Sequence, residues 1–524
     1  MVQKAARLGA VAVTALLIGA PAVAEPQGPL SAIDWLGTQL PPTPAALPPR
    51  PAKPAPAPNE PPVSKNALAP QVNVQPLATS GPRAIGLVPA QITGLPADLW
   101  TGSDVNKLTD LIATLPDLNL PAAQSLLYTL LLAEARAPGD VAAAGDQLVL
   151  ARVEKLVQRG ALDPALSLIE QAGVRSSPAH FDLWMDISLL TGTEDRACGV
   201  LSEMPHITQD YAVRIFCAAR AGEWEDAALT LGSAKALGLV PDEQLDLLAR
   251  FIDPDAAEGL PPLSVPRKMD PLSFRLFEAI GEPIPTTNLP RPYAVADLRD
   301  LAGWKAQIEA AERLTRAGAL PDNRLLGLYS ERKAAASGGV WDRVAAWQRF
   351  ETALEAQSTE AVSKTILPVW REMTSAGIEV SFATLFADSL SEFKLTGRAA
   401  DTAATVALLS PSYERVGSGR SDLAGFIARG AVPLSEGETL ERPEDLYEGA
   451  VFDAFTTAQP RADLVAMVAQ GRLGESILQV LTLMHKGTAG NARALTDALG
   501  TLRALGLEDT ARRAALQVLL LERG

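Results

Sequence analysis

The residue types that most often carry out chemistry are sparse in this chain. Three histidines occur, His180, His206 and His485, and none lies at a metal-binding spacing such as His-Glu-x-x-His. The sequence has no Gly-x-Ser-x-Gly nucleophile motif and no phosphate-binding glycine loop. Ser-x-x-Lys occurs at 330–333 and 391–394, but without the Ser-Asp-Asn and Lys-Thr-Gly motifs that accompany it in enzymes. We therefore expect no catalytic residue, metal site or cofactor.

The chain has two cysteines, Cys198 and Cys217. Cys198 lies six residues after Gly192, and Cys217 lies five residues before Gly222, so the two belong to neighbouring antiparallel helices if each glycine ends a helix. In an oxidising compartment this predicts a disulfide, whose loop of about 20 residues stabilises the fold by up to roughly 3 kcal/mol in the chain-entropy model. The alternative is two separate buried thiols, because a bond needs Cα atoms within about 7 Å.

A glycine pattern predicts the helices that position these cysteines. Gly160, Gly192 and Gly222 are spaced by 32 and 30 residues, and each is followed by an alanine five positions later and by an aliphatic residue nine positions later. The alanines are Ala165, Ala197 and Ala227, and the aliphatic residues are Ile169, Leu201 and Leu231. A period of this size with helical apolar spacing predicts stacked pairs of short antiparallel helices. Alanine-rich, leucine-rich composition with 5% aromatic residues also favours an all-α fold.

The second helices of this pattern resemble tetratricopeptide repeats, or the related Sel1-like repeats. In the segment 221–228, Gly222, Trp224 and Ala227 match that family's turn and second helix. The resemblance covers about 90 residues of the 524, and it departs from the family at Arg214 and Ile215 in the preceding helix. It implies a right-handed α-solenoid with a concave face that binds peptides or proteins, and it implies no catalysis.

Residues 1–24 have the pattern of a secretory signal peptide. Lys4 and Arg7 precede an apolar run, and Ala22-Val23-Ala24 forms a small-residue cleavage site. The alternative is a membrane anchor, but the run is shorter than the roughly 20 residues of a spanning helix. We therefore expect cleavage after Ala24, a periplasmic location and no integral membrane segment in the mature protein. Without Lys4 and Arg7 the formal net charge changes from -15 to -17, which disfavours nucleic acid as a partner.

Residues 25–96 are predicted to form a disordered, proline-rich arm. Within 41–62, 11 of 22 residues are proline, so this part forms a stiff polyproline spacer that spans on the order of 70 Å at about 3.1 Å per residue. The short segment 31–37 precedes the spacer and contains Ile33, Trp35 and Leu36. These three residues form a candidate partner-binding motif. The alternative is that Trp35 packs on the body of its own chain.

The remaining sequence is predicted to form three helical regions and two interruptions. Tetratricopeptide-like repeats are predicted over 97–255, and a proline-rich connector follows over 256–293. Further helical repeats are predicted over 294–410, and they begin with one long helix over 294–317. A mobile loop region over 411–445 precedes C-terminal repeats with a cap over 446–524. In the last region Gly471 and Gly506 repeat the pattern of turn glycines.

One enzymatic alternative involves Glu475 and Ser476. Exported helical chains of this size weakly resemble the superhelical part of soluble lytic transglycosylases, whose acid is the glutamate of a Glu-Ser pair. The Gly-Leu-Met-Gln signature of that family is absent, and only 49 residues follow Glu475. A solvated glutamate in the first turn of a helix explains Glu475 better. We therefore expect an exported, non-catalytic scaffold or adaptor whose partner is an envelope protein or peptide, in a peptidoglycan, outer-membrane transport or motility assembly. The alternative is a peptidoglycan hydrolase with Glu475 as the acid.

Overall fold

The structure is a computed structural model that describes residues 84–299, 301–417, 420–432 and 440–521. These residues form 25 α-helices and four short 3₁₀ helices, and no strand is found within them. Two isolated bridges join Ile85 to Ala135 and Val88 to Ala133. The all-α prediction is therefore confirmed. The predicted signal peptide, the proline-rich spacer and the motif residues Ile33, Trp35 and Leu36 lie outside the described residues.

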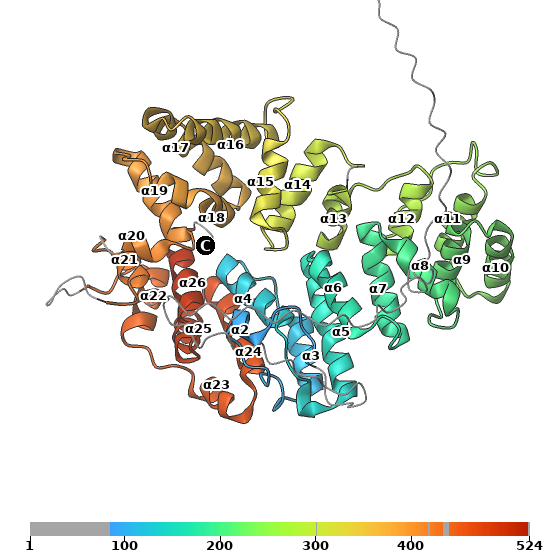
Figure 1. Cartoon of the computed structure of the whole chain (residues 1–524), viewed down its shortest axis with the longest axis horizontal. Coiled ribbons are helices and arrows are strands. Elements are labelled where there is room, and N and C mark those ends of the chain that lie inside the picture. Colours follow the sequence, from blue (N-terminus) through green and yellow to red (C-terminus); the bar gives the residue numbers. More distant parts are fainter. Residues whose placement is uncertain (1–83, 300, 418–419, 433–439, 522–524) are drawn as a thin grey trace, which may run out of the picture. The chain divides into compact units, whose positions relative to one another are not determined.

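The first group of helices packs in chain order from α5 onward (Figure 1). It consists of α2 (Ala90–Thr93), α3 (Val105–Thr114), α4 (Pro121–Leu132), η1 (Pro138–Asp140), α5 (Ala142–Arg159), α6 (Leu162–Ala172), α7 (Pro178–Thr191), α8 (Glu194–Glu203), α9 (Tyr211–Arg220), α10 (Trp224–Leu237), α11 (Asp242–Ile252) and α12 (Pro271–Ala279). From α5 to α12 each helix contacts the next, and α12 also contacts α7. Consecutive packing of this kind buries the apolar side of each short helix against its neighbours.

The second group surrounds a separate apolar core. It consists of η2 (Thr286–Asn288), η3 (Arg291–Tyr293), α13 (Ala294–Asp297), α14 (Trp304–Thr315), α15 (Asp322–Ser330), α16 (Val340–Glu355), α17 (Thr359–Ala376), α18 (Glu379–Leu390) and α19 (Gly397–Leu409). Trp347, Phe350, Phe382 and Phe386 form an aromatic cluster in this core. The single helix predicted over 294–317 is wrong, because the chain leaves helical geometry after α13 and α14 begins only after the extended residue Gly303.

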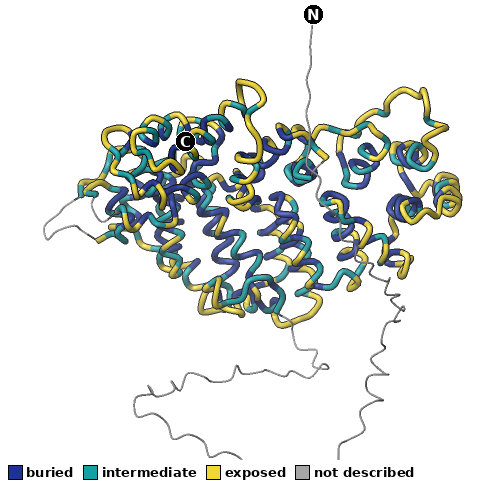
Figure 2. The backbone as a smooth tube through the Cα atoms, turned by 45° about the horizontal axis from the view of Figure 1, so that its top comes forward, coloured by how far each residue is buried: buried dark blue, intermediate teal, exposed yellow. Residues whose placement is uncertain are grey.

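The C-terminal group returns to the start of the described chain. It consists of α20 (Tyr413–Gly417), α21 (Leu423–Ala428), α22 (Leu446–Thr456), α23 (Ala462–Ala466), η4 (Val468–Gln470), α24 (Leu473–Thr488), α25 (Ala492–Ala504) and α26 (Glu508–Leu520). Figure 1 shows α24 and α26 beside the early helices, and α24 contacts α3 and α4 while α26 contacts α4. One apolar core accordingly contains buried residues from 95–296 and from 408–516. Buried residues are dark blue in Figure 2.

The predicted turn glycines all lie between helices. Gly160, Gly192, Gly222, Gly471 and Gly506 have φ values of 84°, 78°, 84°, 69° and 79°. This left-handed conformation is strained for residues with a Cβ atom. At Gly160 the packing imposes a second constraint, since a Cβ atom would lie 2.6 Å from Leu314 Cδ2. Gly160 therefore allows both the turn after α5 and the close approach of α14.

Two short segments, 99–103 and 471–475, join the two ends of the described chain, and we call them the clasp. The amide of Gly102 donates to the carbonyl of Gly471 at 3.0 Å, and the amide of Gly474 donates to the carbonyl of Leu99 at 2.9 Å. Trp100 is completely buried and its ring lies on Gly474. A Cβ atom on Gly474 would lie 2.2 Å from ring carbon Cζ3, so only glycine fits here.

We expect Gly474→Ala to destabilise the protein because its methyl group would displace Trp100 from the clasp. Overpacking of this kind lowers the free energy of unfolding by about 2 kcal/mol. Gly232→Ala in α10 is the matched control, since a Cβ atom there meets nothing within 4 Å. Chemical denaturation of both variants measures the difference, and equal stability of the two would contradict the role assigned to Gly474.

Candidate functional site

The two cysteines form a disulfide between α8 and α9. Their Cα atoms are 5.1 Å apart, and both cysteines of the chain are used in the bond. The prediction from the glycine spacing is confirmed, because Gly192 ends α7 and Gly222 follows α9. The bond ties two consecutive helices of the first group together, and its role is structural.

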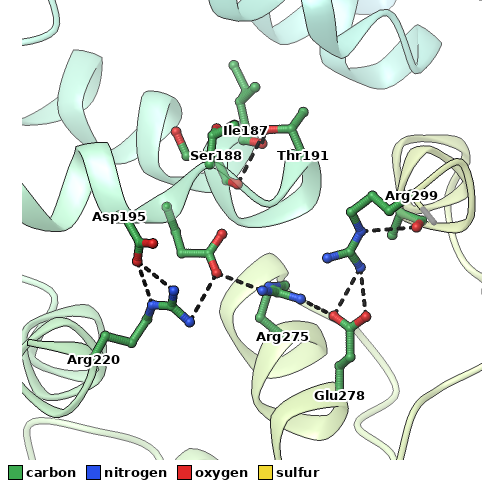
Figure 3. Close-up of polar contacts among 11 residues, drawn as sticks. Ile187, Ser188, Thr191, Asp195, Arg220, Arg275, Glu278 and Arg299 are labelled. Carbon is green, nitrogen blue, oxygen red and sulfur yellow. Dashed lines mark hydrogen bonds and ion pairs between the residues drawn. The ribbon is translucent and has the colours of Figure 1, made fainter. Parts of the chain in front are cut away.

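A chain of alternating charges lies beside this disulfide-bonded pair (Figure 3). Arg220 pairs with Asp195 at 2.6 Å and lies 3.5 Å from Glu194, and Arg275 donates to Glu194 at 2.6 Å. Arg275 also pairs with Glu278, which accepts from Arg299 at 2.9 Å. Glu194 is buried, so losing its arginine partners would leave a buried charge uncompensated. The network connects α8 and α9 to α12, and its members neutralise one another.

Glu475 is a buried ion-pair member of the clasp rather than the solvated glutamate expected from its sequence. It lies in the first turn of α24, as predicted, but its side chain is 0% exposed. Its carboxylate accepts from Lys107 Nζ at 2.6 Å and from Arg472 Nη2 at 2.8 Å. Burial raises the pKa of Glu475, but hydrogen bonds from Arg472 and Lys107 outweigh burial and set the pKa at about 2. A carboxyl group that is ionised at neutral pH holds no proton to donate as a general acid.

We expect Glu475→Gln to destabilise the protein in a pH-dependent way. The folded-state pKa of about 2 lies below the ordinary value of 4.5, so the stabilisation is complete above pH 4.5 and is lost as the pH falls toward 2. A depression of this size corresponds to about 3 kcal/mol at pH 7.

The measurement is the free energy of unfolding of wild type and variant between pH 7 and pH 2.5. The difference should shrink below pH 4.5. Glu360→Gln, at an exposed ion pair with Lys364 on α17, is the control and should change stability little at any pH. A penalty for Glu475→Gln that stays constant with pH would refute the assignment.

The histidines occupy structural positions. His180 is buried, and its Nδ1 lies 2.9 Å from the hydroxyl of Ser177, which caps the start of α7. Burial lowers the pKa of His180, which favours its neutral form at physiological pH. His485 Nδ1 lies 3.0 Å from the carbonyl oxygen of Asp117, and His206 lies in the segment between α8 and α9. Among the described residues no group of three or more potential ligands could hold a metal ion.

Two adjoining pockets lie where helices from distant parts of the chain meet. The first, of about 670 Å³, is a groove with a mainly apolar lining that includes Ile92, Leu132, Leu298 and Val380. The second, of about 740 Å³, is lined by residues of α5 and α14, by the segment between α3 and α4, and by Arg291. Gln124, Arg316 and Gly377 line both pockets.

The second pocket, which we call the basic pocket, gathers five cations around one carboxylate. The cations are Lys155, Arg159, Arg291, Arg313 and Arg316, and the carboxylate is Asp117. Asp117 pairs with Arg159 at 2.7 Å and with Arg291 at 3.0 Å. A hydrogen bond from Arg291 is the largest effect that lowers the pKa of Asp117, so this carboxylate is ionised at neutral pH.

Three of these cations bind the carboxyl ends of helices. Lys155 Nζ donates to the carbonyl of Leu115 at 2.7 Å, just after α3. Arg159 Nη2 donates to the carbonyl of Ala317 at 3.0 Å, just after α14, and Arg316 Nη1 donates to that of Ala376 at 3.1 Å, at the end of α17. Carbonyls at a helix C-terminus attract cations through the helix dipole. Local packing therefore explains the place of each of these three cations.

The sequence offered no signal for the basic pocket. Its cations are spread from 155 to 316, share no spacing, and belong to a chain of net charge -15. Of the residues predicted as sites, Cys198 and Cys217 are brought together, whereas Glu475 lies in the clasp and does not line either pocket.

Comparisons with protein-family models, with curated proteins and with solved structures find no match to this chain. Fold and site define an all-α protein of consecutively packed helices that contains one disulfide and a cationic pocket. Within the described residues no helix is both long and apolar enough to cross a bilayer.

Proposed function

We propose that this protein is an exported, non-catalytic scaffold or adaptor of a cell-envelope assembly, built as a solenoid of tetratricopeptide-like helix pairs. The observation that carries the proposal is the run of consecutively packed helices from α5 to α12, which contains the glycine turns at Gly160, Gly192 and Gly222. Stacked helix pairs present extended surfaces that bind proteins and peptides. The Cys198–Cys217 disulfide supports an oxidising compartment such as the periplasm.

The part of the predicted arm that lies outside the described residues, 25–83, gives the proposal its recognition element. A tryptophan flanked by aliphatic residues, as in Ile33, Trp35 and Leu36, suits insertion into a partner's groove. The proline-rich spacer over 41–62 would hold that motif at a distance from the body. The partner would be an envelope protein or peptide, in peptidoglycan synthesis or turnover, outer-membrane transport or a motility motor.

Crosslinking in cells tests the adaptor role. The full chain, a form lacking 25–62 and a Trp35→Ala variant would be crosslinked, and the captured proteins identified by mass spectrometry and tested for direct binding when purified. We expect an envelope protein that binds the full chain and is lost from both altered forms. If both altered forms still bind the same partner, the helices rather than the arm recognise it. Failure of any envelope protein to bind would refute the adaptor role.

The alternative function, a peptidoglycan hydrolase with Glu475 as acid, receives no support from the ionised and buried carboxylate. We expect the purified protein to produce no clearing in a zymogram that contains peptidoglycan. Clearing by wild type that disappears in a folded Glu475→Gln variant would favour the enzyme and contradict the non-catalytic assignment.

A further inference from the structure

We propose that the basic pocket binds a compact, multiply charged phosphate anion, either free or as the phosphorylated group of a larger molecule. This inference does not depend on the adaptor role. It starts from the balance of charge, since five cationic side chains and one carboxylate give the lining a formal charge of +4 in a chain of net charge -15. Clustered charge of one sign in a concave site concentrates ligands of the opposite sign.

The hydrogen bonds to helix ends do not balance this charge. Lys155 and Arg159 are 5% and 2% exposed, and Lys155 has carbonyl and amide oxygens as its hydrogen-bond acceptors. Arg313 donates to the carbonyls of Thr286 and Leu289. A carbonyl satisfies a donor but carries no net charge, so among the described residues Asp117 is the one carboxylate that pairs with any of the five cations.

Mutual repulsion is the consequence of this arrangement. Burial and the neighbouring Arg159 outweigh Asp117 and lower the pKa of Lys155. Burial together with Arg291 and Arg316 likewise outweighs Asp297 and lowers the pKa of Arg313. Arg159 Nε is in addition buried with no hydrogen-bond partner among the described residues. Capping of helices accounts for the place of individual cations, but it leaves their positive charge unbalanced around one open volume of about 740 Å³. An anion in this volume would remove the repulsion.

The charge and shape favour phosphate over a single carboxylate. A phosphate monoester carries about -1.5 to -2 at pH 7, so a pyrophosphate or two phosphate groups would balance the lining charge. Four of the five cations are arginines, whose planar guanidinium groups donate paired hydrogen bonds to phosphate oxygens. One carboxylate would neutralise only a quarter of the lining charge.

The test is isothermal titration calorimetry of the full chain with inorganic pyrophosphate at roughly 20 mM and 200 mM NaCl. We expect saturable 1:1 binding that weakens at the higher salt concentration. Arg291→Gln and Arg313→Gln should each weaken binding about 10-fold or more, since each removes a charged hydrogen-bond donor. Arg349→Gln is the matched control, because this exposed arginine of α16 lies outside the pocket and should leave the affinity unchanged.

Asp117→Asn distinguishes ligand binding from helix capping. This variant removes the one carboxylate of the lining, so we expect pyrophosphate to bind about 3-fold or more tightly. Asp117 is largely exposed, so the test remains valid even if an arginine variant fails to fold. If the cations are purely structural, pyrophosphate will bind neither the wild type nor Asp117→Asn. That result would overturn the proposal.

Two further titrations identify the source of the anion. The first titration uses phosphatidylcholine vesicles with and without phosphatidic acid, to test whether the pocket binds a lipid phosphate. Binding that requires phosphatidic acid and is lost in Arg313→Gln would assign the site to a phosphorylated headgroup. Binding to pyrophosphate but not to these vesicles would assign it to a soluble phosphorylated molecule. A hexaglutamate peptide that binds more tightly than pyrophosphate would overturn the phosphate assignment in favour of an acidic peptide.

Discussion

The contact on which the rest of the structure depends is the clasp between the two ends of the described chain. The ring of Trp100 packs on Gly474, and each of the two segments donates one backbone hydrogen bond to the other. Glu475 also forms an ion pair with Lys107. This contact places α24 against α3 and α4 and brings α26 onto α4. One apolar core can therefore contain residues from both ends, and a run of helices that could have stayed open becomes closed.

The meeting of several helix ends has an electrostatic result at the basic pocket. Three helices, α3, α14 and α17, direct their carboxyl ends toward the neighbourhood of α5 and Arg316, and the carbonyls there bind Lys155, Arg159 and Arg316. Because each helix end attracts its own cation, convergence of the ends also makes the cations converge. The basic pocket thus forms where these helix ends meet, and it carries more positive charge than Asp117 balances.

Local features of the fold could be predicted from the sequence, whereas distant contacts could not. The helical class, the turns at Gly160, Gly192 and Gly222, and the disulfide depend on residues within about 60 positions of one another. The sequence predicts the position of Glu475 in a first helical turn, but its burial against Lys107 involves a contact that no periodicity indicates. The basic pocket is likewise invisible in sequence, because its members come from separate segments that only packing brings together.

The position of the clasp also determines the order in which the chain can mature. Trp100 and Gly474 are separated by 374 residues, so Trp100 leaves the ribosome long before the glycine that it packs on. Joining segments so far apart costs on the order of 5 kcal/mol of chain entropy. The face of α4 that packs on α26 stays exposed until α26 is in place, and exposed apolar surface of this kind favours aggregation of the incompletely folded chain.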